Sequence, residues 1–508
     1  MPPAAPDCAG CAARDEEIAL LRDQVDVLRA QLKEQQEKIA RLERLLSRNS
    51  GNSSMPPSSD DQPGEKQPKD RSRRTDGRRK PGKQPGAPGA YLAWNDHPGK
   101  KVDHFPEGDC ACGADLAGAE DLGVTASHQV TGIPAQEAQT TQHDRHTVRC
   151  RCGRLHTAPA PAEAGAPGTV VYGVNIQAWC VFLMVMHHIP VQRCADILES
   201  LTGTRPSDGY VHSLLARAAR GVAAVNKLIR ALIVLARVVC ADETPIRCGP
   251  GPKTRKKYLL VVCTNLLTCY FLGDRDLATF QEFVFPDLSG SVIVHDRYAC
   301  YDHFGGVSHQ LCAAHLLRDL EDAAATYPDA IWPGQVASNL RALIHQANLA
   351  RARGLDAVPA DSIAEELKLF RHGVRAGLSQ VRRIPGSRQK QPPGRLLLEC
   401  LRDREHDVLR FLTDLGVPPT NNQAERDARP AKTQQKISGR LRSEKATRDR
   451  YALRGYLSTA AKHGISIFTA ILGALTGNPW MPPIPDYALN PARQQSHSAI
   501  RNNTGALA

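Results

Sequence analysis

Residues 238–244 read Val-Val-Cys-Ala-Asp-Glu-Thr, an apolar run that ends in carboxylates. Short apolar runs rich in β-branched residues predict buried strands, so we expect a strand over 238–241 that ends at Asp242. Outward from it, the pattern predicts strands at 258–264, 267–272 and 291–294, a helix at 277–283, a short strand at Leu311–Cys312 and a helix from His315. The strand at 291–294 ends at Asp296. This order predicts a mixed sheet covered by helices, in a multidomain α/β protein.

A third carboxylate stands in a basic, helical stretch further along the chain. Residues 421–430 read Asn-Asn-Gln-Ala-Glu-Arg-Asp-Ala-Arg-Pro, which places Glu425 among cations. Together, Asp242, Asp296 and Glu425 could bind a pair of Mg²⁺ (or Mn²⁺) ions, because these cations prefer oxygen ligands. Two such ions can activate a water or a 3′-hydroxyl and stabilise the leaving oxygen of a phosphodiester. The pattern therefore indicates an enzyme that cuts and joins DNA strands.

Other side chains near these acids could assist them. Cations at helical steps beside the third acid could form one phosphate-contacting face, or a plain solvated face: Arg426, Arg429, Lys432 and Lys436. Cys312 and His315 are expected to support the active site by packing or hydrogen bonding, while a second metal site there is the alternative. Glu243 and Asp427 neighbour the acids but should face elsewhere, given the periods of strands and helices. Residues 321–414 are polar and helical in pattern, and we interpret them as an insertion.

The N-terminal residues 15–48 carry apolar side chains at alternating steps of three and four. The seam consists of Ile18, Leu21, Val25, Leu28, Leu32, Gln35, Ile39, Leu42 and Leu46. This heptad pattern predicts a coiled coil that makes the chain at least a dimer. The alternative is a lone amphipathic helix that packs on its own domain.

Residues 49–100 are rich in Pro, Gly, Ser, Lys and Arg. Such a composition cannot bury enough apolar surface to fold alone, so we expect a disordered basic linker. Its basic cluster includes Arg73, Arg74, Arg78 and Arg79. The cluster is either solvated or a flexible arm that grips DNA phosphates.

Two matching motifs in residues 101–157 predict a zinc-finger-like, zinc-ribbon-like module. They read Cys110-Ala-Cys112-Gly and Cys150-Arg-Cys152-Gly. Four thiolates near glycines suit a tetrahedral Zn²⁺ site, although one residue rather than the usual two separates each pair.

Residues 158–235 follow with a helical pattern. Segments 189–201 and 210–219, separated by a break that contains Gly203, Pro206 and Gly209, could form a helix-turn-helix that reads DNA. The same spacing is common in plain helical bundles. Residues 481–508 are expected to be a disordered tail.

Length and charge limit the classes of protein that this chain can be. At 508 residues the chain is too long for one ordinary core, and a formal net charge of +12 with a pI near 9.1 favours a polyanionic partner. No signal peptide opens the sequence, and its apolar runs fall short of the roughly 20 residues that a membrane helix needs. We therefore expect a cytoplasmic protein whose cysteines are thiols or metal ligands.

Taken in order, these motifs resemble the insertion sequence 66 transposase family. The resemblance spans roughly residues 15–480. It rests on the leucine seam, the Asn-Ser-Gly-Asn-Ser-Ser and Gly-Lys-Gln-Pro-Gly stretches of the linker, the cysteine pairs, Ala-Asp-Glu-Thr at 241–244, His-Asp-Arg-Tyr-Ala-Cys-Tyr at 295–301, Cys-Ala-Ala-His at 312–315 and the 421–440 segment. The order and coverage of the motifs, rather than any single one, make the resemblance specific.

The resemblance implies a DDE-type transposase with a ribonuclease H-like catalytic domain over residues 236–475. Asp242, Asp296 and Glu425 would be its acidic triad, and its partners would be the DNA of the element ends and of the target. Accessory proteins of the same element could take part. A nuclease or resolvase that cuts without joining is one alternative. A catalytically inactive DNA-binding protein derived from a transposase is another.

Overall fold

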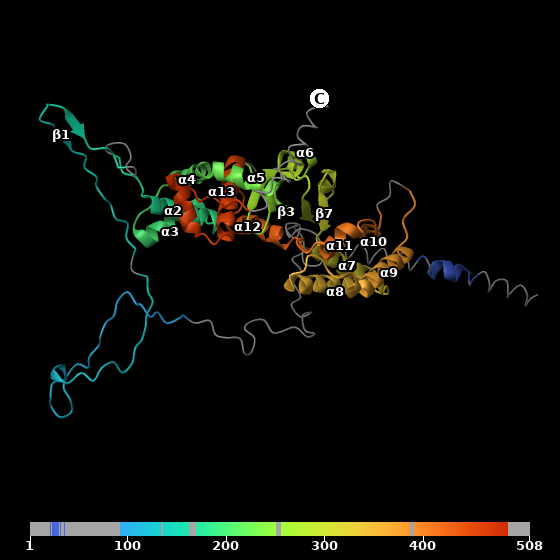
Figure 1. Cartoon of the computed structure of the whole chain (residues 1–508), viewed down its shortest axis with the longest axis horizontal. Helices are drawn as coiled ribbons and strands as arrows, with labels where there is room; N and C mark the ends of the chain where they lie inside the picture. Colours follow the sequence, from blue (N-terminus) through green and yellow to red (C-terminus); the bar gives the residue numbers. More distant parts are fainter. Residues whose placement is uncertain are drawn as a thin grey trace, which may run out of the picture. The chain divides into compact units, whose positions relative to one another are not determined.

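The computed structural model describes residues 92–133, 136–161, 169–249, 256–386 and 391–485, together with Leu21, residues 23–29, Gln31 and Gln35 near the N-terminus (Figure 1). The chain divides into two compact units. One comprises residues 63–139 with 201–203, and the other comprises the remainder. Among the described helices, none is long and apolar enough to span a bilayer.

A five-stranded mixed sheet lies at the centre of the larger unit. Its strands are β3 (Val238–Arg247), β4 (Lys256–Cys263), β5 (Thr268–Gly273), β6 (Val292–His295) and β7 (Ser308–Leu311), in the spatial order β5-β4-β3-β6-β7. Strand β4 pairs antiparallel with both β3 and β5, whereas β6 pairs parallel with β3, and β7 parallel with β6. The predicted mixed sheet is therefore confirmed, with the strands in the predicted sequence order.

One predicted boundary is wrong, because β3 does not end at Asp242. It pairs with β6 only over Val238–Cys240 and then continues along β4 as far as Arg247. Along this second half, the free edge of β3 is covered by Gln435, which accepts from the Arg247 N–H at 3.1 Å and donates to the Pro245 C=O at 3.1 Å. Asp242 thus lies in mid-strand, at the point where β3 loses its parallel neighbour.

The end of the sheet also differs from the prediction. The strand expected at Leu311–Cys312 is instead β7, which ends at Leu311, and α7 (Ala313–Thr326) begins before His315. Cys312 occupies the N-cap position between the two elements. The predicted strand was misplaced because Ser308-His309-Gln310 carries little apolar character, although Gln310 is fully buried.

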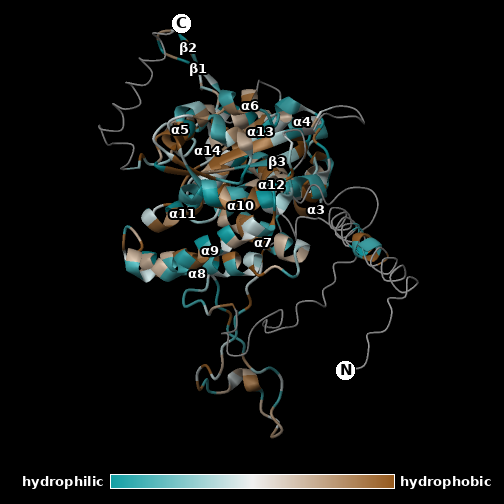
Figure 2. Ribbon diagram, turned by 90° about the vertical axis from the view of Figure 1, so that its right-hand side faces the viewer, coloured by the Kyte–Doolittle hydropathy of each residue, from teal (hydrophilic) through white to brown (hydrophobic). Residues whose placement is uncertain are grey.

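Helices cover both faces of the sheet. One face contributes to the largest core, which it shares with residues of six helices: α2 (Val174–Val185), α4 (Asp208–Gly221), α5 (Ala223–Val234), α6 (Leu277–Glu282), α13 (Glu444–Lys462) and α14 (Ile467–Thr476). The other face packs on α12 (Asn422–Ser438), where Cys240 and Val294 meet Ala424 and Ala428. Hydrophobic residues concentrate along the strands and the inner sides of these helices (Figure 2).

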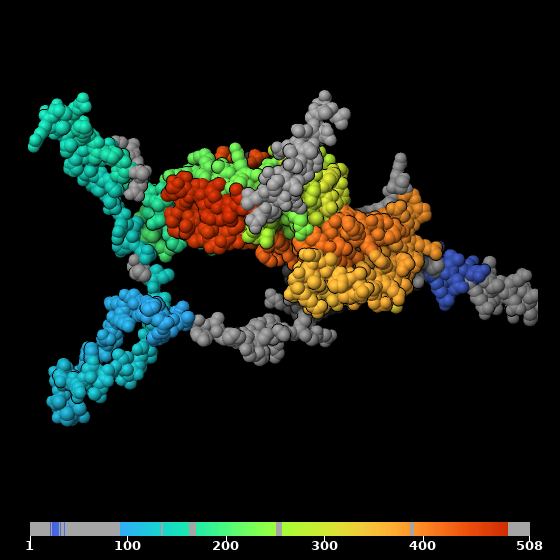
Figure 3. Space-filling model, in the orientation of Figure 1, coloured from blue at the N-terminus to red at the C-terminus, as the bar shows by residue number. Residues whose placement is uncertain are grey.

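The region interpreted as an insertion is helical and has its own core. It contains the end of α7, then α8 (Trp332–Ala352), α9 (Ala364–Gln380), α10 (Pro393–Asp403) and α11 (Glu405–Thr413). Helix α9 packs closely against α10 because it carries Gly377 at the contact. A Cβ atom at this position would lie 2.7 Å from the Leu398 side chain of α10. In the space-filling view these helices form the yellow and orange part beside the green and red helices (Figure 3).

The N-terminal part of the larger unit holds a short hairpin and a pair of helices. The hairpin is β1 (Thr147–Arg149) with β2 (Leu155–Thr157), and the helices are α3 (Val191–Thr202) and α4. Gly209, which was predicted to lie in the break between the helices, belongs to α4 instead. The reason is that the Ser207 hydroxyl caps the helix by accepting from the Tyr210 N–H. A DNA-reading role for this pair stays a prediction.

Candidate active site

The strand pairing places the first two acids side by side. Cys240 of β3 is in register with Val294 of parallel strand β6, so Asp242 and Asp296 each lie two residues beyond this pair. Because side chains alternate along a strand, both acids continue the face occupied by Cys240 and Val294, which is the face covered by α12. Asp296 also begins the turn after β6, where its Oδ1 accepts from the Tyr298 N–H at 2.8 Å.

Glu425 is brought to the same place by a buried asparagine. The Asn421 side chain is fully buried and donates to the backbone C=O of Ala241 at 2.6 Å. Its backbone N–H donates to the Cys312 Sγ at 3.2 Å, which fixes the start of α12 between β3 and α7. Glu425 then follows after one helical turn, and its N–H donates to the Asn421 C=O at 3.1 Å. Asn421 belongs to the 421–430 segment, but no local pattern indicates its role.

Asp242 interacts with both of the other carboxylates through their charges. Burial, and after it the neighbouring charges of Asp296 and Glu425, together raise the pKa of Asp242 to about 7. Burial likewise raises the pKa of Asp296. A cluster of partly buried acids that repel one another is stabilised by a bound cation, and its oxygen ligands suit Mg²⁺ or Mn²⁺.

The neighbouring carboxylates face elsewhere, in agreement with the period of the strand and the helix. Glu243 accepts from the Tyr301 hydroxyl at 2.8 Å, within the core on the opposite face of the sheet. Asp427 is buried and accepts from Thr268 at 3.0 Å and from Lys462 at 2.8 Å. Asp427 therefore ties α12 to β5 and α13, which is a structural role.

Cys312 and His315 both lie beside Glu425. Ligand atoms of these three residues lie within 4.8 Å of one another, and the His315 Nδ1 is 3.6 Å from the Glu425 Oε1. Burial lowers the pKa of His315 to about 3 and raises the pKa of Cys312 to about 11. The imidazole is therefore neutral and the thiol protonated at neutral pH. Because the Cys312 sulfur already accepts from Asn421, this arrangement fits support of α12 better than a separate metal site.

The cations of α12 do not all share one face. At about 100° per residue, Arg429, Lys432 and Lys436 lie on the Glu425 side of the helix, whereas Arg426 lies about a quarter-turn away. Arg426 instead donates to Gln423 at 3.2 Å. Lys432 is half-buried; burial lowers its pKa, and the charges of Asp242 and Glu425 oppose this effect. Lys432 therefore lies close enough to Asp242 and Glu425 for their charges to act on it.

Two further arginines near the acids were missed in the sequence. Arg318 of α7 donates to the Glu425 Oε1 at 3.4 Å. Arg275, in the turn between β5 and α6, has a terminal nitrogen 3.9 Å from the Asp296 Oδ2. Neither position stands in a motif, and only the folded chain brings them to the acids.

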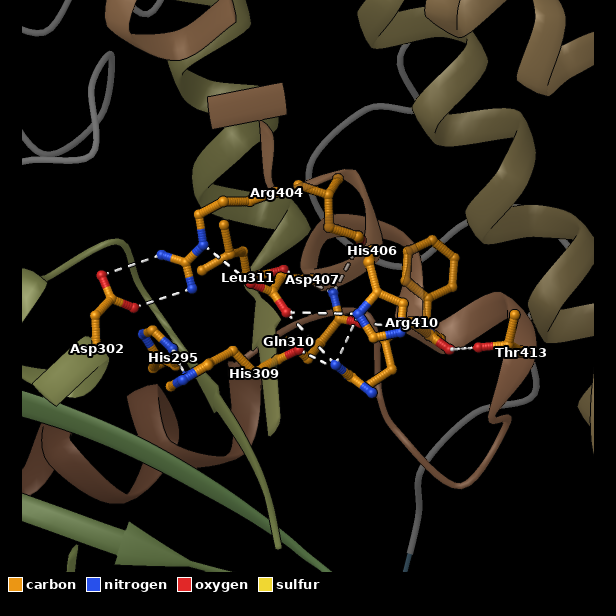
Figure 4. Close-up of polar contacts among 12 residues, drawn as sticks. His295, Asp302, His309, Gln310, Leu311, Arg404, His406, Asp407, Arg410 and Thr413 are labelled. Atoms are coloured by element: carbon orange, nitrogen blue, oxygen red, sulfur yellow. Dashed lines mark hydrogen bonds and ion pairs between the residues drawn. The ribbon is translucent and has the colours of Figure 1, made fainter. Parts of the chain in front are cut away.

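A second group of His and Asp residues comes from β6, β7 and the segment that joins them (Figure 4). His295 and His309 share a hydrogen bond of 3.0 Å, and Asp302 is near them but binds Arg404 at 3.0 Å. A guanidinium on this carboxylate disfavours a metal ion, so the group is a hydrogen-bonded network. The Arg410 side chain donates to the His309 C=O at 2.8 Å, which joins α11 to β7 and hence the insertion to the sheet.

The two cysteine pairs belong to different units, and all four thiols are exposed and free of disulfides. The basic cluster with Arg73, Arg74, Arg78 and Arg79 lies outside the described residues, so its phosphate-binding role stays a prediction.

Two family models match the sequence. Residues 5–93 match a family of unknown function, DUF6444, and residues 169–449 match the family described as Transposase IS66 family. No curated protein matches the chain. The second match covers more than half of the 508 residues and includes the sheet, the insertion and all three acids. The chain therefore belongs to the IS66 family of transposases, whose general function is DNA transposition.

Proposed function

We propose that this transposase binds the ends of its element and catalyses metal-dependent DNA strand cleavage and strand transfer, with Asp242, Asp296 and Glu425 as its acidic triad. The observation that carries the proposal is the proximity of Asp242 to both other acids, because burial and then the charges of Asp296 and Glu425 raise the pKa of Asp242 to about 7. Strand order β5-β4-β3-β6-β7, with three antiparallel strands followed by two parallel ones, supports a ribonuclease H-like catalytic domain.

The three carboxylates would hold two Mg²⁺ or Mn²⁺ ions. When bound, these ions would polarise the phosphodiester and activate the attacking water or 3′-hydroxyl. The chain itself supplies geometry. Asn421 fixes the start of α12 against β3, and Glu425 then lies close enough for its charge to act on Asp242. The face formed by Arg429, Lys432 and Lys436 would hold the DNA backbone beside the acids.

A gel assay separates this function from its alternatives. The purified protein is incubated with Mg²⁺ and a duplex that carries the sequences flanking the gene. Cut and joined products support a transposase, cutting alone indicates a nuclease or resolvase, and binding alone indicates an inactive derivative. Either of the last two results overturns the proposal.

The cysteine pairs form two equivalent turns. The Cys110 C=O accepts from the Gly113 N–H at 2.7 Å, and the Cys150 C=O accepts from the Gly153 N–H at 2.8 Å. Both glycines have positive φ, 86° and 89°, which only glycine adopts readily. A backbone hydrogen bond from Cys112 lowers the pKa of the Cys110 thiol, and one from Cys152 does the same for Cys150. These features favour thiolates that are ready to bind zinc.

Accordingly, we expect one structural Zn²⁺ per chain on Cys110, Cys112, Cys150 and Cys152. The sharing of a single ion by both cysteine pairs is a prediction from the sequence. Elemental analysis should find one zinc per chain, and the change of Cys150 and Cys152 to Ser should remove it. The matched control is the change of the free, half-buried Cys300 to Ser, which should leave the zinc in place. Zinc-free protein with four reactive thiols would contradict the prediction.

The predicted coiled coil is only partly described. Leu21 and residues 23–29 are helical, and the seam residues Leu21, Val25 and Leu28 are 52%, 43% and 62% exposed in the single chain. Of the later seam residues, Gln35 is described, whereas Leu32, Ile39, Leu42 and Leu46 lie outside the described residues. We propose that a second copy of the chain covers this seam, because its apolar residues follow the heptad period.

Replacement of Leu21 and Leu28 with Asp should therefore convert the protein from at least a dimer to a monomer in light scattering. The control is Val27→Asp, which changes an exposed apolar residue (57%) that lies off the seam. The same oligomer in all variants would place the subunit contact elsewhere.

A further inference from the structure

The buried carboxylate Glu243, next to the acids, forms an ion pair with Arg275. The Glu243 side chain is 2% exposed, and one of its oxygens accepts from Arg275 twice, from Nε at 2.8 Å and from a terminal nitrogen at 2.5 Å. The other oxygen accepts from the Tyr301 hydroxyl at 2.8 Å. Glu243 is thus held from both sides, and it fixes the plane of the Arg275 guanidinium.

Arg275 is also held by an aromatic ring. Its guanidinium carbon lies 3.8 Å from the centroid of the Tyr298 ring, and the Tyr298 hydroxyl donates to the Arg275 C=O at 2.7 Å. Tyr298 belongs to the turn that Asp296 begins. The position of Arg275 is therefore fixed relative to one of the three acids.

The guanidinium nevertheless reaches the active site. The Arg275 side chain is 34% exposed, and its terminal nitrogen is 3.9 Å from the Asp296 Oδ2. A cation at this place weakens the binding of metal ions by Asp296, so it is unfavourable unless an anion joins the site. The ion pair with Glu243 also gives weak grounds for a role in stability alone, because desolvation of a buried pair offsets much of its attraction. Both points are accounted for if Arg275 binds substrate.

We propose that Arg275 binds a non-bridging oxygen of the reacting phosphodiester, on the Asp296 side of the acids, and that Glu243 and Tyr301 position it. This proposal rests on the proposed function and names a further catalytic residue for it. Arg275 remains protonated throughout and transfers no proton. Its hydrogen bonds strengthen as negative charge grows on the phosphoryl oxygens, in the way of other preorganised donors. An arginine suits the role because its planar fork can bind Glu243 and the phosphate at the same time.

The proposal is tested with Arg275→Gln, Arg275→Lys and Glu243→Gln in the full chain. Single-turnover strand cleavage in Mg²⁺ should fall by about 100-fold or more in the glutamine variant, which is the usual effect of losing one such donor. The Arg275→Lys variant should recover little of the cleavage rate, because lysine lacks the planar guanidinium group. Glu243→Gln should cause a smaller loss. The control is Arg341→Gln, which removes a half-exposed arginine that pairs with Glu321 on the insertion and should cut at the normal rate.

Two binding measurements distinguish a catalytic from a merely structural role. DNA binding in Ca²⁺ and the rise in melting temperature on adding Mn²⁺ should be nearly unchanged in Arg275→Gln. A normal cleavage rate would overturn the inference, as would a loss of rate that is matched by an equal loss of Mn²⁺ stabilisation, since Arg275 would then only order Asp296. Failure of the unmodified protein to cut in any metal would instead refute the proposed function itself.

Discussion

Replacement of Glu425 with Gln is expected to reduce strand cleavage by at least about 1000-fold, with little change in DNA binding. The amide keeps the shape of the side chain but removes the charge that would hold a metal ion. A bound ion contributes several kcal/mol of transition-state stabilisation, and each 1.36 kcal/mol corresponds to a tenfold change in rate. Asp242→Asn and Asp296→Asn should have effects of the same size. The measurement is single-turnover cleavage of end DNA in Mg²⁺, with binding followed separately in Ca²⁺.

The matched control for these variants is Glu444→Gln. Glu444 is also a glutamate in the first turn of a helix, but it forms an exposed ion pair with Arg448 at 3.4 Å on α13. Such pairs contribute little, so this variant should cut normally. Cleavage by Glu425→Gln at a rate near normal would remove Glu425 from the triad.

The second large effect concerns stability in the absence of metal. The folded chain raises the pKa of Asp242 from 3.8 to about 7 through burial and the charges of Asp296 and Glu425. A raised carboxyl pKa means that the folded state binds the proton more tightly than the unfolded state does. The resulting stabilisation is complete below the unfolded pKa and is lost as the pH rises through the folded pKa. At 1.36 kcal/mol per pKa unit, the loss amounts to roughly 4 kcal/mol at most.

Asp242→Asn should therefore melt at a higher temperature than the unmodified protein at pH 8 in EDTA, and the two should converge as the pH falls to the unfolded pKa of Asp242, at about pH 4. Addition of Mn²⁺ should stabilise the unmodified protein, more at pH 8 than at pH 6, because protons compete with the metal ions. The variant should gain little from Mn²⁺. Differential scanning calorimetry checks all three expectations. A metal-induced shift that is the same in the variant and at both pH values would contradict the account.

Asp242 and Glu425 illustrate what local patterns can predict and where they fail. Apolar runs identified β3 and β6 because their residues are buried, and the helical period identified α12. The end of β3 was misjudged because Asp-Glu-Thr-Pro resembles a strand end, whereas the strand is continued by its pairing with β4 and by Gln435, which lies 190 residues from Pro245 in sequence. No local pattern carries that information.

The supporting residues were harder to predict than the acids. Asn421 and the Ala241 C=O are separated by 180 residues, and Arg275 and Glu243 by 32. Each pair forms only when the sheet, its turns and α12 are assembled. A cation such as Arg275 has no period or motif of its own, and its significance depends on the buried partner that it meets.

We propose that three carboxylates hold metal ions that catalyse phosphoryl transfer without a covalent protein–DNA intermediate. The most direct measurement is the reaction of the unmodified protein with DNA that flanks its gene, analysed on denaturing gels with and without protease treatment. The account predicts cut and joined strands in Mg²⁺ or Mn²⁺, none in EDTA or with Asp242→Asn, and the same products before and after protease. Products in EDTA, or DNA that remains attached to the protein until protease is added, would contradict it.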